Sequence, residues 1–112
     1  MDYDDLMGRF HQTLKIAARN DAMLMVMDTL IKIAELLIEK LEKERAVEIL
    51  AFVLCYPMRP ESRARAETLY LELEAELCPR VLLDARRLAD ELTLDDLLEA
   101  IIGAEAPPDT LG

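Results

Sequence analysis

Hydrophobic residues recur at steps of three and four along most of the chain, which is the spacing of one face of an α-helix. The pattern predicts five or six short helices and no strand. The first covers about residues 3–17 and ends at the turn dipeptide Asn20-Asp21, with Asp2 as its N-cap. The others are expected over residues 22–40, 44–55, 61–77, from Pro79 through Ala89, and 94–102.

The second predicted helix, residues 22–40, is apolar around too much of its circumference for a surface helix. Its main stripe is flanked on both sides by further aliphatic residues, and Met25 and Leu36 fall on the opposite side. We therefore expect neighbours on more than one of its faces. The stripe consists of Met23, Met27, Leu30, Ala34, Leu37 and Leu41.

The third predicted helix is apolar almost all round, and Pro57 and Pro60 follow its end. The fourth and fifth carry single stripes, and Thr93 with Asp96 has the spacing of a capping box before the sixth. Gly103 is expected to end that last helix. The predicted organisation is one domain over residues 1–103 and a flexible tail over residues 104–112, which hold two prolines.

Composition supports an all-α fold and narrows the possible partners. The 112 residues suffice for one domain, and 53% are hydrophobic but only 4% aromatic, which suits closely packed helices. The net charge of −10 is the wrong sign for a nucleic-acid or anionic-membrane binder. The longest apolar run, residues 49–58, is too short for a membrane span, and the N-terminus is acidic, unlike a secretory signal. With only two cysteines, a cytoplasmic location is expected.

Residues 27–57 follow the rhythm of a helical hairpin and resemble a tetratricopeptide repeat. Small residues, Ala34 and Ala46, stand where two helices would approach closely. More narrowly, residues 12–102 resemble the C-terminal helical segment of long bacterial tetratricopeptide proteins, including STAND-type signalling ATPases and regulators. The narrower resemblance is carried by residues 46–54, Pro57, residues 63–67 and residues 71–77. The repeat resemblance is carried by Leu30, Ile33, Ala34 and Leu37 in the first helix of the unit, and by Ala46, Leu50, Val53 and Pro57 after it.

The resemblance implies a short right-handed solenoid with C-terminal capping helices and a role in binding proteins. The chain departs from the family pattern, because Leu41 stands near the turn position that usually holds glycine and only one repeat is complete. Three scattered glycines cannot form a phosphate-binding loop, so any ATPase is absent here. The exposed positions of the 22–40 helix, which include Asp28 and Glu35, do not suit a clamp for a peptide carboxylate.

Candidate catalytic groups are few, and each has a structural interpretation. His11 is the only histidine, and nothing pairs it with a cysteine, so Cys55 and Cys78 are expected to be buried structural thiols. The acidic pairs Asp4-Asp5 and Asp95-Asp96 fall in first helical turns, where negative charge is favoured. The basic groups Arg63-Arg65 and Arg86-Arg87 alternate with acids and are expected to form solvated faces.

The sequence therefore predicts a non-catalytic protein-interaction or assembly module that needs no cofactor or metal. Self-association as a homodimer, or binding to another protein, is expected. The alternative is a carrier whose apolar helices enclose a small molecule or lipid. Met23, Met25 and Met27 suit either an adaptable binding surface or the core. The core is favoured for Met23 and Met27, which belong to the stripe, whereas Met25 lies on the outer face. The residues predicted to form an interface are Met7, Phe10, Leu14, Met25 and Leu36.

Overall fold

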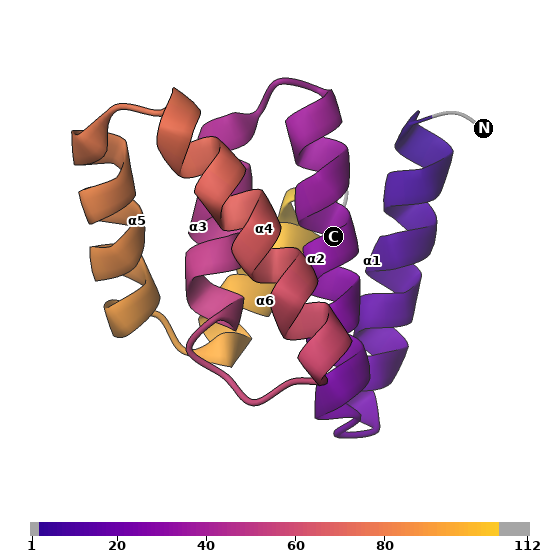
Figure 1. The fold of residues 1–112 in the computed structure, drawn as a ribbon. Helices are drawn as coiled ribbons and strands as arrows, with labels where there is room; N and C mark the ends of the chain where they lie inside the picture. The colour runs from indigo at the N-terminus through magenta and orange to yellow at the C-terminus, as the bar shows by residue number, and fades with distance from the viewer. Residues whose placement is uncertain (1–2, 106–112) are drawn as a thin grey trace.

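The computed structural model describes residues 3–105, which form six helices and no strand (Figure 1). This confirms the all-α prediction. Asp2, the predicted N-cap, and residues 106–112 of the predicted tail lie outside the described residues. The helices are α1 (Tyr3–Arg19), α2 (Met23–Glu39), α3 (Lys43–Val53), α4 (Pro60–Glu76), α5 (Pro79–Glu91) and α6 (Leu94–Glu105).

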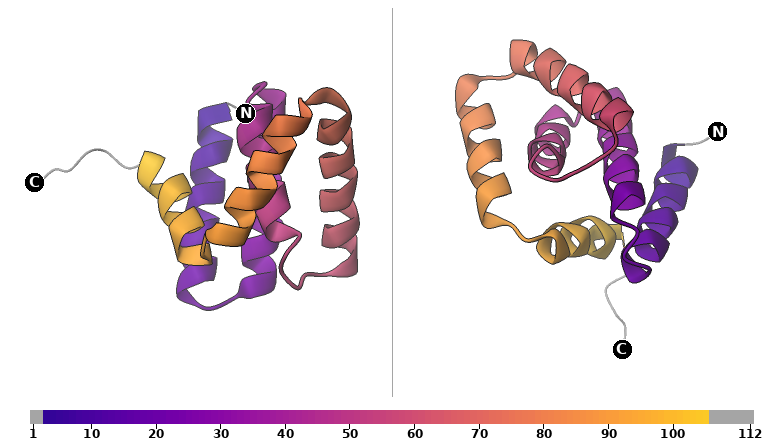
Figure 2. Two further views of the ribbon diagram at one scale, coloured as in Figure 1. Left: turned by 90° about the vertical axis from the view of Figure 1, so that its left-hand side faces the viewer. Right: turned by 60° about the horizontal axis from the view of Figure 1, so that its bottom comes forward.

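Helix α3 lies at the centre of the molecule. It packs against α2, α4 and α5, and the chain from α4 to α6 runs around it in the right-hand view of Figure 2. A helix surrounded in this way needs an apolar side chain in nearly every direction, which explains its sequence. Its buried residues are Ala46, Val47, Ile49, Leu50, Ala51, Phe52 and Val53.

Helix α2 is packed between α1, α3 and α4, so the expectation of neighbours on more than one face is confirmed. The side opposite its main stripe is covered at Leu36, which is 7% exposed, but not at Met25, which is 46% exposed. The two ends of the stripe also differ from the prediction, because Met23 and Leu41 are exposed. Both lie at helix ends, where no further turn of a neighbouring helix covers them.

The two tight turns that join α1 to α2 and α2 to α3 have the same backbone geometry. In the first, the amide of Ala22 donates to the carbonyl of Ala17 and the amide of Asp21 donates to that of Ala18. In the second, Glu42 donates to Leu37 and Leu41 donates to Ile38. Both are Schellman motifs, and this motif requires a left-handed residue after the helix.

The outer helices complete the core from two sides. Helix α1 packs against α2 and touches α6. Helix α5 packs on α3 rather than on α4, its predecessor in the chain. The residues that these helices bury are His11, Leu14 and Ala17 in α1, Leu82, Ala85 and Ala89 in α5, and Leu97, Leu98 and Ile101 in α6.

Two predicted helix ends need correction, and one predicted start is confirmed. Helix α3 ends at Val53 rather than at residue 55, and α6 continues through Gly103 to Glu105, so Gly103 does not end it. At the start of α6, the amide of Asp96 donates to Thr93 Oγ1 and the amide of Thr93 donates to Asp96 Oδ2. This reciprocal pair is the predicted capping box.

Candidate functional site

Four exposed apolar residues lie at the end of the α1–α2 hairpin. Ile16 lies in the last turn of α1, and Met23, Leu24 and Met25 form the first turn of α2. This end of the hairpin extends beyond the other helices at the bottom of Figure 1 and of the left view in Figure 2. We call these four residues the turn-end surface. A group of apolar side chains left in water marks an interaction site more often than single exposed ones do.

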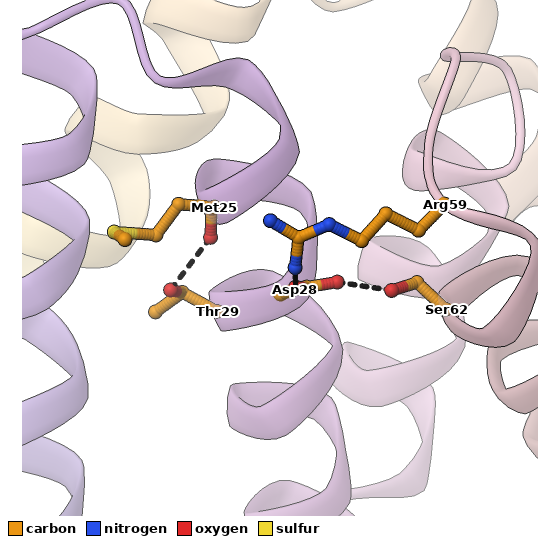
Figure 3. Close-up of polar contacts among 5 residues, drawn as sticks. All are labelled: Met25, Asp28, Thr29, Arg59 and Ser62. Atoms are coloured by element: carbon orange, nitrogen blue, oxygen red, sulfur yellow. Dashed lines mark hydrogen bonds and ion pairs between the residues drawn. The ribbon is translucent and has the colours of Figure 1, made fainter.

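The start of α2 is held in place by polar contacts, which Figure 3 shows. The hydroxyl of Thr29 donates to the carbonyl oxygen of Met25 at 2.7 Å. One turn away, Asp28 Oδ2 accepts from Arg59 Nη1 at 2.7 Å, and Ser62 donates to Asp28 Oδ1. Arg59 and Ser62 stand at the N-terminus of α4, whose dipole also favours the Asp28 carboxylate. The turn-end surface is therefore presented on a fixed backbone.

The charge around the turn-end surface is nearly balanced, unlike that of the whole chain. Residues 15–25 contain the bases Lys15 and Arg19 and the acid Asp21, whereas residues 88–112 contain seven acids and no base. Most of the net charge of −10 therefore resides in the C-terminal quarter of the sequence. Electrostatic repulsion between two copies is weakest where the local charge is balanced.

The structure separates the five residues that the sequence predicts as an interface. Met25 is exposed and belongs to the turn-end surface. Met7 and Phe10 are half-buried and pack against the core from α1, Leu14 is a core residue of the chain itself, and Leu36 is buried. Neither Leu14 nor Leu36 is accessible to a partner. Ile16, Met23 and Leu24 were missed because the stripe pattern gives no sign of where the covering helices stop.

The candidate nucleophiles and the only histidine lie on different segments of the fold. His11 is buried in α1. Cys55 and Cys78 are both exposed free thiols, so the prediction that they are buried is wrong. Each lies where a helix has just ended, at the α3–α4 connection or the α4–α5 junction, and such segments run over the surface. Met27 is buried and Met25 is exposed, as predicted, but Met23 was expected in the core and is exposed.

Of the four arginines predicted to be solvated, Arg65, Arg86 and Arg87 are exposed and Arg63 is half-buried, but three of them also make specific contacts. Arg63 donates from Nη1 to the carbonyl of Leu54 at 3.3 Å and from Nη2 to that of Tyr56 at 2.7 Å, next to the C-terminus of α3. Arg65 Nε lies 2.5 Å from Glu35 Oε2. Arg86 donates to the Tyr70 hydroxyl at 2.8 Å, and this bond raises the pKa of Arg86. These arginines join helices together.

Two clefts flank the N-terminal half of α3 and have Arg45 and Ile101 in common. One, of about 300 Å³, lies towards α1 and includes Tyr3 and His11 in its lining. The other, of about 360 Å³, lies between α3, α5 and α6, and we call it the α3–α5–α6 cleft. Arg45 and Glu48 are its charged residues, and its apolar lining comprises Ile49, Leu88, Leu92, Leu97, Ala100 and Ile101.

Within residues 3–105, no three His, Cys, Asp or Glu side chains come together as a group that could hold a metal ion. Among the helices of the same residues, none combines the length and the hydrophobicity that spanning a membrane would require. No family model, curated protein or solved structure matches the chain.

Proposed function

We propose that the protein is a non-catalytic assembly module that associates with a second copy of itself through the turn-end surface. The observation that carries the proposal is that Ile16, Met23, Leu24 and Met25 are all exposed at the protruding end of one hairpin, on more than one side of α2. A two-fold interface brings the same patch of both copies together, so one exposed patch is enough to form it. The bases Lys15 and Arg19 would then lie near Asp21 of the second copy.

The tetratricopeptide-like architecture, with a role in a cytoplasmic bacterial signalling protein, is part of this proposal. The architectural part of the proposal is supported by the order in which the helices pack. Helix α2 pairs with α3, α4 packs on both, and α5 packs on α3. Stacked helical hairpins pack in this order, each against its nearest neighbours. Helices α4 and α5 associate only weakly, which departs from the pattern of stacked hairpins. Such weak pairing suits capping helices better than a regular repeat.

The test is the molecular mass of the purified chain over a concentration range, measured by sedimentation velocity. We expect a concentration-dependent dimer for the wild type and a monomer for Met25→Glu, because a charge on the apolar patch would be desolvated in the interface. Leu83→Glu is the matched control, since Leu83 is an exposed leucine on α5. A wild-type chain that stays monomeric at high micromolar concentration refutes the proposal, as does equal disruption by both variants.

A further inference from the structure

The α3–α5–α6 cleft has an apolar interior with ionisable groups only at its edge. Its volume of about 360 Å³ falls in the range of small-molecule sites. All three helices contribute aliphatic side chains, and Ile49, Leu97 and Ile101 are already buried while Leu88 and Leu92 are half-buried. An apolar chain entering the cleft would shield the half-buried side chains from water, which is favourable in proportion to the apolar area covered.

The two charged residues of the cleft lining differ in whether they already have an ion-pair partner. Arg45 is paired with Glu42 on its own helix, with Nη1 and Oε1 2.9 Å apart. Glu48, one turn further along α3, makes no hydrogen bond or ion pair within residues 3–105. Glu44 precedes it by one turn and is close enough for its charge to act on the Glu48 carboxyl. A ligand head group at this edge therefore meets an excess of carboxylates.

We propose that the α3–α5–α6 cleft binds a cationic amphiphile, a molecule with one alkyl chain and an ammonium-type head group. The alkyl chain would lie among Leu88, Leu92 and Leu97, and the head group would pair with the Glu48 carboxylate. The inference does not depend on the assembly role, because the cleft and the turn-end surface share no residue. The five acids and absent bases of residues 88–102 would also attract a cation to this part of the chain.

An anionic amphiphile is disfavoured by the same contacts. To reach Arg45, a carboxylate head group would have to displace Glu42 and lie close to Glu48 and Glu44. The partial burial of Glu48 at the cleft already raises the pKa of its carboxyl, with the Arg45 charge opposing and the Glu44 charge adding to this effect. A second anion beside Glu48 would disfavour its ionised form further, whereas a cation would favour that form.

The test compares three probes of equal chain length, octylammonium, octanoate and octanol, titrated into the full chain at neutral pH. Binding is followed by calorimetry and by the NMR amide shifts of Ile49, Leu88 and Leu97. We expect octylammonium to bind about tenfold more tightly than octanoate, with shifts confined to α3, α5 and α6. Equal or tighter binding of octanoate overturns the proposal, as does the absence of octylammonium binding or its localisation at the turn-end surface.

Two variants separate the head-group contact from the apolar cavity. Glu48→Gln should weaken octylammonium binding about fivefold and leave octanol binding unchanged. Ala100→Phe should fill the cleft and weaken all probes that bind there. Glu72→Gln, which changes an exposed carboxyl on α4, is the charge-matched control and should bind like the wild type. If Glu48→Gln and Glu72→Gln weaken octylammonium binding equally, the contact with Glu48 is refuted.

Discussion

Asp21 and Leu41 occupy the same position in two turns of the same type, and both have a left-handed backbone. Their φ angles are 55° and 63°, and each is the residue after the C-cap of a Schellman motif. Aspartate tolerates this conformation because its short side chain hydrogen-bonds locally, but leucine does not. Leu41 is also 78% exposed, so its side chain gains little from burial in return.

We predict that Leu41→Gly stabilises the protein by about 1 kcal/mol, because glycine adopts a positive φ without a steric penalty. Urea unfolding followed by circular dichroism measures the change. Asp21→Gly is the matched control, and its gain should be smaller because aspartate is already tolerated there. A loss of stability in Leu41→Gly would show that the leucine side chain contributes more to the fold than its exposure indicates.

The position of Leu41 illustrates what the sequence could predict. Helical spacing located each helix of residues 3–105, and the predicted break between residues 40 and 44 contains the turn in which Leu41 is left-handed. The apolar circumference of α3 correctly indicated burial, because such a helix has no wet face. These features depend on neighbours within a few residues, so a single sequence contains them.

The features that the sequence did not predict depend on contacts between distant segments. The exposure of Met23, which was expected in the core, follows from how far the α1–α2 hairpin extends past its neighbours. Arg63 had the pattern of a surface residue, yet it binds carbonyls seven and nine residues earlier in the chain. The α3–α5–α6 cleft brings together residues of three helices that are up to 56 positions apart in the sequence, from Arg45 to Ile101.

Arg63 gives a prediction about the end of α3. The carbonyls of Leu54 and Tyr56 accept hydrogen bonds from its guanidinium. Arg63→Ala should therefore lower the free energy of unfolding by about 1–2 kcal/mol, because a charged donor to partly buried acceptors is lost. Arg65→Ala is the control on the same helix. Its more exposed pair with Glu35 should be worth less than about 1 kcal/mol. Similar losses in the two variants would contradict this account.

Asp28 gives a prediction about the packing of α2 against α4. It accepts from both Arg59 and Ser62, and its side chain is 25% exposed. Asp28→Ala should destabilise the protein by about 1 kcal/mol. A double-mutant cycle with Arg59→Ala should give a coupling energy of about 0.5 kcal/mol, since Arg59 is exposed. A coupling energy near zero would leave Ser62 as the contact that matters, which Ser62→Ala would then show.

The pH dependence of stability should reveal the environment of Glu48. Loss of water around its carboxyl raises the pKa above the ordinary value of 4.5, with Arg45 lowering it and Glu44 raising it. A carboxyl with a raised pKa binds its proton more tightly in the folded state than in the unfolded chain. Its contribution to stability is therefore present at low pH and is lost as the pH rises from 4.5 through the folded pKa.

Above this window, ionised Glu48 lowers the free energy of unfolding, so Glu48→Gln should raise the Tm at neutral pH. The gain should shrink as the pH is lowered towards and below 4.5, because protonated glutamate resembles glutamine. Thermal unfolding at several pH values measures this, and Glu72→Gln corrects for the altered net charge. A gain that is independent of pH would show that the effect of Glu48 on stability does not come from its ionisation. Octylammonium should reduce the difference between the two proteins at neutral pH, since it binds the chain with the Glu48 carboxylate more tightly and therefore stabilises that chain more.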